Sequence, residues 1–297
     1  MARTKEIKYI TISDLVDKSK YSNNEMYFDE HFGILMNHGS IPDNEWMLPF
    51  QPYRSKEYRI IRVHTGWCRY IINMRECYEK RNTINILPPG SLIMKVEESD
   101  DHGSEIISID DIGDLSARVP QSTDLVFDVS EKQGVRVGAY YDFLMKQLNA
   151  GTFNDESVRS IVSSLLCFDL QLYDEQNKTN SDVKLSPHEE LYNRFVKMLG
   201  KYGNRKHEIP FYADRLFVSP NHLGKVVLEQ SHRSAHDWIN QSVLMEARML
   251  LLHSDLTILE IADKLNFPNS PFFCRFFKRE MEMTPTDYRK SILSAKK

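Results

Sequence analysis

The side chains that could hold a metal or carry acid–base chemistry are scattered along the first half of this chain. The first four histidines, His31, His38, His64 and His102, include no H-x-H pair, the spacing that would place two metal ligands close together. His64 is followed by Thr-Gly-Trp-Cys rather than by a second histidine. The adjacent acidic pairs near residue 100 are typical of solvated loop charges. These patterns predict no metal, no other cofactor and no catalysis.

The composition is that of a globular protein with two domains. Of its 297 residues 41% are hydrophobic, and no stretch reaches the roughly 18 uninterrupted apolar residues of a membrane span. The segment after Met-Ala-Arg-Thr-Lys-Glu is too short and too soon polar for a signal peptide, so we expect a cytoplasmic protein without membrane contact. The absence of any C-x-x-C pair favours buried, reduced thiols. The cysteines are Cys68, Cys77, Cys167 and Cys274.

The charged residues are unevenly distributed. Residues 1–187 hold 21 Lys and Arg against 29 Asp and Glu, whereas residues 188–297 hold 17 against 13 and six of the ten histidines. The distribution of charge bears on partners more than the total of −4 does. A basic C-terminal part on an acidic body therefore favours contact with a polyanion through one domain only.

A duplicated sequence in the C-terminal part presents two basic residues in equivalent places. Ala213-Asp-Arg-Leu216 recurs as Ala262-Asp-Lys-Leu265, and Leu223-x-Lys-Val-Val recurs as Phe273-x-Arg-Phe-Phe. In each copy a short helix is followed by a turn and a second helix, whose apolar triplet at i, i+3 and i+4 faces the first. Proline stands early in each second helix, where its missing N–H does no harm. This is the plan of a helix-turn-helix.

Further patterns define the two units and their separation. Thr257 and Glu260 form a capping box, which predicts the start of a helix. Apolar residues recur at three- and four-residue steps from Ser234 to Ser254, which predicts one amphipathic helix between the copies. That helix would span about 31 Å, close to the ~34 Å between major-groove segments on one face of B-DNA. The residues expected to contact DNA are Asn221, His222, Lys225, Ser270, Phe272, Arg275, Lys278 and Arg279.

Several C-terminal motifs stand in a characteristic order. They are Ser219-Pro220-x-x-Leu223, Trp238-Ile239, Ile261-Ala262, Leu265-x-Phe267, Phe273-x-Arg275-x-Phe277-Lys278 and Thr284-Pro285-x-x-Tyr288-Arg289. Through these motifs, residues 188–297 resemble the DNA-binding domain of the AraC/XylS family of bacterial transcription regulators. The resemblance implies two recognition helices that enter the major groove. The chain departs from the family at three positions where glycine is usual, namely Asn266, His232 and Glu282. Pro271 and Phe272 replace polar base readers, so we expect the first recognition helix to carry more of the specificity.

Residues 28–130 carry short apolar runs separated by Gly, Pro, Asn and Asp, which predicts a small sandwich or barrel. The runs are 32–36, 58–63, 68–72, 83–87, 91–96, 106–109 and 125–129. Pro52-Tyr-Arg-Ser-x-x-Tyr58 and Leu87-Pro-Pro-Gly90 resemble the cupin-type arm of the same regulator family. The resemblance implies a β-barrel sensor, and we expect Arg62, His64 and Trp67 to line its ligand site.

Two helices are expected after the strands, over 140–148 and 157–176. The second has an apolar stripe that includes Val158, Ile161, Val162 and Leu165. Helices at this place pair two subunits in the family that the chain resembles, so the stripe favours a homodimer; the alternative is that it packs on the barrel. The expected fold class is α+β with several domains: a cupin-like sensor and dimerisation domain at 1–175, a linker at 176–186, and a DNA-binding domain with two helix-turn-helix units at 187–297.

These patterns together predict a sequence-specific transcription regulator that binds double-stranded DNA as a homodimer. A small-molecule effector would bind in the N-terminal barrel, and RNA polymerase is a further expected partner. Two alternatives remain open. One is a cupin-fold enzyme with a DNA-binding tail, which would need a metal that the histidine spacing does not indicate. The other is a regulator whose N-terminal domain senses a protein partner.

Overall fold

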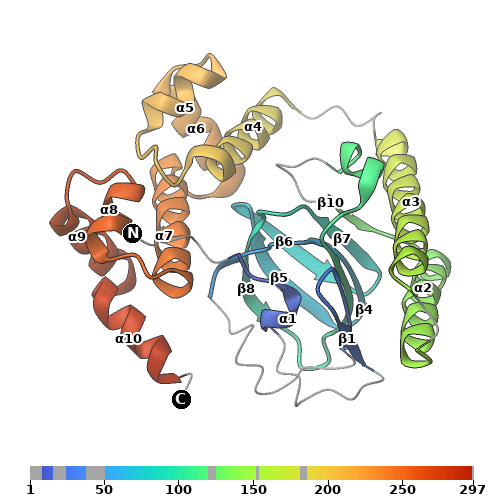
Figure 1. Ribbon diagram of the computed structural model, residues 1–297. Coiled ribbons are helices and arrows are strands. Elements are labelled where there is room, and N and C mark those ends of the chain that lie inside the picture. Colours follow the sequence, from blue (N-terminus) through green and yellow to red (C-terminus); the bar gives the residue numbers. More distant parts are fainter. Residues whose placement is uncertain are drawn as a thin grey trace. The chain divides into compact units, whose positions relative to one another are not determined.

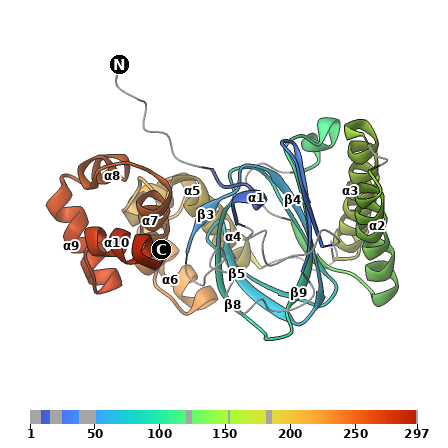
Figure 2. The same ribbon diagram turned by 60° about the horizontal axis from the view of Figure 1, so that its bottom comes forward.

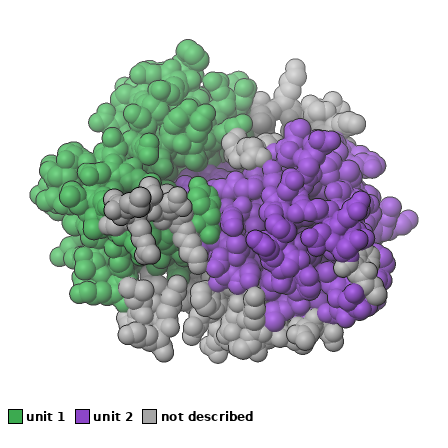
Figure 3. All heavy atoms as spheres, in the orientation of Figure 1, with its two compact units in different colours: residues 1–9, 51–53, 185–297 green, residues 10–50, 54–184 purple. Residues whose placement is uncertain are grey.

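The computed structural model describes residues 9–15, 25–37, 51–119, 125–151, 154–180 and 186–295, so that His38 lies outside the described residues. The chain divides into two compact units, which are coloured separately in Figure 3. Residues 10–50 and 54–184 form the N-terminal unit, and residues 185–297 form the C-terminal unit together with 1–9 and 51–53. Within the described ranges, no helix combines the length and the apolar character that crossing a membrane requires.

The strands of the N-terminal part form two sheets (Figure 1). The six-stranded sheet has the order β1-β2-β9-β4-β7-β10, and the four-stranded sheet has the order β3-β8-β5-β6. The first consists of β1 (Met26–Phe28), β2 (Phe32–Asn37), β9 (Gly103–Ile109), β4 (Tyr58–Thr65), β7 (Thr83–Leu87) and β10 (Leu125–Asp128). The second consists of β3 (Tyr53–Arg54), β8 (Leu92–Glu98), β5 (Trp67–Ile72) and β6 (Arg75–Lys80). Short α1 (Ile12–Leu15) precedes them, and the 3₁₀ turn η3 (Gly113–Ala117) follows β9.

All the apolar runs named above coincide with strands, whereas β1, β3 and β6 were not predicted from the sequence. β6 was missed because only Cys77 and Glu79 of its six residues are buried, which leaves a polar sequence. The prediction of a barrel is wrong in one respect, because the described strands pair in two separate sheets. A closed barrel and two facing sheets bury alternate residues in the same way, so periodicity does not distinguish them.

Helices α2 (Glu131–Asn149) and α3 (Asp155–Asn180) cover one face of the six-stranded sheet (Figure 2). Alternate strand residues such as Ile60, Ile84 and Ile107 face them in one continuous core. α2 starts nine residues before the predicted position, at a capping box of Ser130 and Gln133. Its start was missed because Gly134 and Gly138 lower the helix propensity of this segment.

The apolar stripe of α3 points into this core. Val158, Val162 and Leu165 are buried members of it, and Ile161 packs against it while partly exposed. Three of the four side chains thus pack on the sheet, as in the packing alternative. An apolar stripe has the same period whether it faces a sheet or a partner chain, so the sequence left both interpretations open. The helix also continues to Asn180, past the predicted linker start at 176, since no Gly or Pro interrupts it.

Residues 186–295 of the C-terminal unit form helices joined by short connections. Its central helix is α7 (Ala235–His253), in which every residue from Ser242 to Leu251 is buried. Ser234 caps its first turn and Ser254 follows its last, so the helix has the predicted bounds, but its second half is buried on all sides rather than amphipathic. The other helices are α4 (Pro187–Tyr202), α5 (Ile209–Leu216), α6 (Pro220–Ser231), α8 (Ile258–Lys264), α9 (Ser270–Met281) and α10 (Pro285–Ala295).

A group of polar side chains lies buried between the six-stranded sheet and its two helices. Arg62 on β4 pairs with Glu105 on β9 at 2.5 Å, with the side chains 11% and 7% exposed. Gly138 on α2 makes room for this pair, because a Cβ there would lie 2.6 Å from Arg62 Nη1. Tyr141 donates a hydrogen bond to Ile60 O at 3.1 Å. The core of the N-terminal unit thus contains the Arg62–Glu105 ion pair, and α2 packs closely against it.

Asp169 on α3 is fully buried near the same group, and neither of its carboxylate oxygens has a hydrogen-bond partner among the described residues. Burial raises the pKa of Asp169 well above its usual value of 3.8, although the charge of Arg62 acts in the opposite direction. The folded chain therefore binds a proton at Asp169 more tightly than the unfolded chain does. The ionised side chain costs stability once the pH exceeds the unfolded pKa.

We expect Asp169→Asn to become more stable relative to the native chain as the pH rises. The difference in the free energy of unfolding should be constant below about pH 4 and then grow by at most about 1.4 kcal/mol per pH unit, up to the raised pKa of the folded state. Urea unfolding between about pH 4 and pH 8 measures it. Asp142→Asn, at an exposed position of α2, is the control. A difference for Asp169→Asn that does not change with pH would contradict the argument.

Candidate nucleic-acid interface

The second helices of the two helix-turn-helix units, α6 and α9, begin in the same way. Ser219 Oγ accepts a hydrogen bond from His222 N at 3.2 Å, and Asn269 Oδ1 accepts one from Phe272 N at 3.1 Å. A proline lies in the first turn of each helix. Such caps satisfy N–H groups that the start of a helix leaves without partners. The first residue of each recognition helix is therefore fixed by its own sequence.

The turns before these helices are also equivalent. Val218 N donates a hydrogen bond to Ala213 O at 3.1 Å, and Phe267 N donates one to Ala262 O at 2.9 Å. The residue before each donor, Phe217 or Asn266, has left-handed backbone with φ of 58° or 61°. One left-handed residue followed by a hydrogen bond back to the helix is a common way to end a helix. It sets the direction of the next helix in both units.

The capping box that the sequence predicted for the second unit is present. Thr257 N donates to Glu260 Oε2 at 2.7 Å, and Glu260 N donates to Thr257 Oγ1 at 3.2 Å. This box begins α8. The inner faces of the two second helices are the expected apolar triplets, and all six side chains are buried. They are Leu223, Val226, Val227, Phe273, Phe276 and Phe277.

The residues predicted to contact DNA lie on the opposite, outer faces. Ser270 is half-buried and the other seven are exposed: Asn221, His222, Lys225, Phe272, Arg275, Lys278 and Arg279. The side chain of Lys225 is 74% exposed. Lys225 and Arg275 hold the same place in the two copies, two residues after the first buried residue of the triplet. A solvated face would look the same, so the exposure alone does not identify a partner.

The outer face of α6 has little net charge. Lys225 Nζ lies 3.8 Å from Glu229 Oε1, one helical turn further on. Glu229 also pairs with His188 of α4 at 3.3 Å, and the His188 ring contacts that of His222 edge to face. Acidic, basic and neutral polar groups are thus close together on this helix. Such a surface suits hydrogen bonding to base edges better than a general attraction to phosphate.

The outer face of α9 is clearly basic. Leu228 and Glu229 of α6 are replaced at the equivalent places by Lys278 and Arg279, beside Arg275. The guanidinium of Arg275 lies over the Phe272 ring, 4.5 Å from its centroid, and Arg279 pairs with Glu280 at 2.7 Å. Stacking on Phe272 holds the Arg275 side chain along the helix surface. A cluster of this kind suits contact with the phosphate backbone.

The side chains expected to line a ligand site in the N-terminal unit do not converge. Arg62 faces α2 and pairs with Glu105. His64 lies two residues further along β4, against Gly103, whose Cβ would be 2.5 Å from His64 Cε1. Trp67 belongs to the other sheet and stacks on Tyr78 at 5.5 Å. Alternation along a strand does not tell inward from outward when both faces carry polar groups, which explains why the sequence did not separate them.

Two polar groups that the sequence did not single out lie inside the N-terminal unit. Asn85 Nδ2 on β7 donates to Glu79 Oε1 on β6 at 2.6 Å, a hydrogen bond that joins the two sheets through buried side chains. Cys68, Glu98 and His102 form a second group, with one donor atom from each within 4.8 Å of the others. Glu98 and His102 are four residues apart, but Cys68 joins them only through strand pairing. No spacing rule along the chain could have found it.

Comparisons with known proteins bear on the C-terminal unit most directly. A family described as "Helix-turn-helix domain" matches residues 212–291, which contain the second unit and the first unit from Tyr212 onward. The chain is 25% identical to the regulatory protein PocR of Salmonella typhimurium over 196 residues, which are 63% of this chain and 59% of PocR. It is 32% identical to the HTH-type transcriptional activator RhaS of Escherichia coli over 77 residues, 26% of this chain and 28% of RhaS. The chain thus spans less than two thirds of the length of these relatives.

Among solved structures, ToxT from Vibrio cholerae aligns over 88% of this chain and 97% of its own, with 13% identity and a TM-score of 0.38. The family match covers the duplicated motifs from Tyr212 onward, in the segment where the caps and turns repeat. The C-terminal domain belongs to the AraC/XylS family. The two curated relatives named above are described as regulators and not as enzymes.

This AraC/XylS domain has left-handed backbone at each position where the resemblance placed a glycine. The residues after the two recognition helices, His232 and Glu282, have φ of 56° and 60°. Their N–H groups donate to Leu228 O and Lys278 O, each at 2.9 Å. Asn266 in the turn has a φ of 61°. The three non-glycine residues therefore adopt the left-handed conformation that glycine favours. The steric cost is larger for His232 and Glu282 than for Asn266.

We expect His232→Gly to raise the free energy of unfolding by about 0.5 to 1 kcal/mol, since glycine adopts this conformation without a Cβ clash. Gln230→Gly, two residues earlier at an exposed position inside α6, is the matched control and should lower it by about 1 kcal/mol. Urea unfolding of both variants, followed by far-ultraviolet circular dichroism, measures the two changes. Equal destabilisation by both glycines would mean that the left-handed residue is not strained.

Proposed function

We propose that the chain is a sequence-specific transcription regulator that binds double-stranded DNA through both helix-turn-helix units. The observation that carries the proposal is the equivalence of α6 and α9, which begin, turn and end alike and expose polar and basic side chains outward. The helix between the units, α7, has 19 residues and a length of about 28 Å. This is comparable to the ~34 Å between successive major-groove segments on one face of B-DNA.

We infer from their charges that the two recognition helices, α6 and α9, contact different parts of the DNA. Asn221, His222 and Lys225 on α6 would contact base edges, because this face is polar with little net charge. Arg275, Lys278 and Arg279 on α9 would contact phosphates, with Ser270 and Phe272 near the helix start. Sequence specificity would then reside mainly in the first unit. The salt-dependent part of the affinity for DNA would come mainly from the second unit.

We propose that the N-terminal unit is a cupin-like sensor for a small polar effector. Its support is the buried hydrogen bond between Glu79 and Asn85 and the buried Arg59, polar groups that a purely structural apolar core would not contain. The effector would bind between the two sheets and shift the fraction of molecules able to bind DNA. Of the predicted ligand residues, Arg62 faces α2 rather than this space.

A homodimer remains part of this proposal, although the face that would form it differs from the predicted stripe on α3. The outer face of α2 carries Val135, Ala139 and Phe143 at steps of four residues, and all three are exposed. Val135 is 62% exposed and Phe143 is 46% exposed. Apolar residues at this spacing are typical of a helix that packs against another. RNA polymerase is the further partner that transcription control by such a dimer would involve.

The proposal predicts which basic residues matter for DNA binding. The double variant Lys225→Ala with Arg275→Ala should lower affinity for a duplex of arbitrary sequence roughly tenfold, and should reduce the slope of log affinity against log salt by about one, because Arg275 is the residue of the pair assigned to a phosphate. Fluorescence anisotropy at several stated salt concentrations measures both quantities. The matched control is Lys132→Ala with Lys146→Ala, which removes the same charge from exposed positions of α2.

Equal affinities and slopes for the two double variants would show that the outer faces of α6 and α9 do not contact DNA, which would contradict the proposal. A smaller loss in the control than in the test variant is expected, because net charge alone acts at a distance and is screened by salt.

A further inference from the structure

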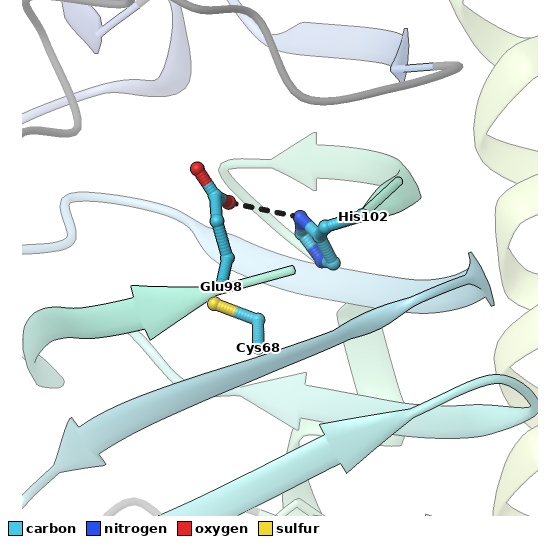
Figure 4. Close-up of side chains that lie close together, drawn as sticks. All are labelled: Cys68, Glu98 and His102. Carbon is cyan, nitrogen blue, oxygen red and sulfur yellow. Dashed lines mark ion pairs between the residues drawn. The ribbon is translucent and has the colours of Figure 1, made fainter. Parts of the chain in front are cut away.

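Cys68, Glu98 and His102 lie close together in the N-terminal unit (Figure 4). Cys68 comes from β5, Glu98 is the last residue of β8, and His102 stands in the turn just before β9. One thiol sulfur, one carboxylate oxygen and one imidazole nitrogen lie within 4.8 Å of one another. Sulfur, nitrogen and oxygen donors at this separation are the ligands that transition metals find in proteins.

The backbone holds the three residues in place. Cys68 is the register partner of Glu98, and a β-bulge between Arg69 and Tyr70 sets this pairing. The turn after Glu98 is closed by hydrogen bonds from Ser99 N to Trp67 O and from His102 N to Ser99 O, at 2.9 and 3.0 Å. Trp67 N in turn donates to Ser99 Oγ at 2.9 Å. The turn therefore returns the imidazole to the side of the sheet where the thiol lies.

The group is buried and incompletely satisfied. Cys68 is fully buried, and His102 is 3% exposed. Nε2 of His102 has no hydrogen-bond partner among the described residues, while Nδ1 lies 3.0 Å from Glu98 Oε2. An imidazole nitrogen that is buried without a partner costs free energy. The structure of the protein alone does not offset that cost, whereas a bound ion would give the ring a partner.

The carboxylate of Glu98 has a neighbour at each of its two oxygens. Lys95 Nζ lies 2.8 Å from Oε1, and His102 lies beside Oε2. A metal bound to Nε2 of His102 could take Oε2 as a second ligand while Lys95 stays on Oε1. Lys95 would then orient the carboxylate from outside the ligand set, as partners of metal ligands commonly do.

We propose that Cys68, Glu98 and His102 form a binding site for one divalent zinc-class ion. A thiolate, a carboxylate and a neutral imidazole carry two negative charges in total, which offset the charge of the ion itself. Ligands of tetrahedral zinc lie roughly 3.3 to 3.6 Å apart, so small side-chain rotations complete the site. Three protein ligands leave a fourth position for water or for an oxygen donor of a small molecule.

Metal binding at this site requires the thiol to lose its proton. Burial raises the pKa of Cys68 to about 12, although its hydrogen bond with Tyr70 and the charge of Lys95 act in the opposite direction. The thiol is therefore protonated in the metal-free protein, where Sγ donates to Glu97 O at 3.3 Å. One proton leaves Cys68 for each ion bound.

The test is a titration of the full, chelator-treated chain with Co²⁺, followed by the absorption of the thiolate-to-cobalt charge transfer. We expect one Co²⁺ per chain and displacement of the band by Zn²⁺. Cys68→Ser should abolish the band. Cys77→Ser, which changes the buried cysteine of the neighbouring strand β6, should keep it. A native chain without the band, or a band that survives in Cys68→Ser, overturns the proposal.

A second pair of variants keeps all four cysteines and decides the matter if Cys68→Ser does not fold. His102→Gln should bind Co²⁺ at least tenfold more weakly than the native chain. His31→Gln, which alters an exposed histidine paired with Asp110, should bind it as the native chain does. Circular dichroism verifies that both variants are folded. Equal affinities of the two variants for Co²⁺ would show that His102 is an ordinary buried partner of Glu98, and the site would be rejected.

Discussion

The angle between the two short helices of each unit is set by one left-handed residue and one backbone hydrogen bond. Phe217 and Asn266 supply the left-handed conformation, and the N–H of the next residue bonds back to an alanine carbonyl of the first helix. Once this turn is closed, the apolar triplet of the second helix has only one place to pack. The opposite face, with its basic residue, must then point outward. The exposure of Lys225 and Arg275 thus follows from a turn that neither residue touches.

The two helix-turn-helix units share one backbone arrangement but carry different charges on the outer faces of their second helices. On α6 an acidic side chain, Glu229, compensates Lys225, whereas the corresponding place on α9 is Arg279 beside Arg275. Packing does not require this difference, since all four side chains lie on exposed faces. One copy is suited to hydrogen bonding with bases and the other to attraction by phosphates. The buried helix α7 between them keeps the two surfaces at a fixed separation.

Local signals in the sequence predicted local structure well. The capping box at Thr257, the helix from Ser234 and the apolar strands are specified by residues a few positions apart, and they are present in the structure. Features that depend on which elements meet were not predictable in this way. The stripe of α3 has one periodicity whether it faces a sheet or a partner. Cys68 reaches His102 through the pairing of β5 with β8, so the candidate metal site has no signature along the chain.

The central claim is that two recognition helices, held apart by α7, read DNA together. Selection of duplexes from a random pool by the purified chain, at a stated low salt concentration, tests it most directly. The account predicts enrichment of a motif with two contacted segments about one helical turn, roughly 10 base pairs, apart, with stronger base preference in the segment that α6 contacts. Enrichment of a single short segment, or a pool that stays random, would contradict it.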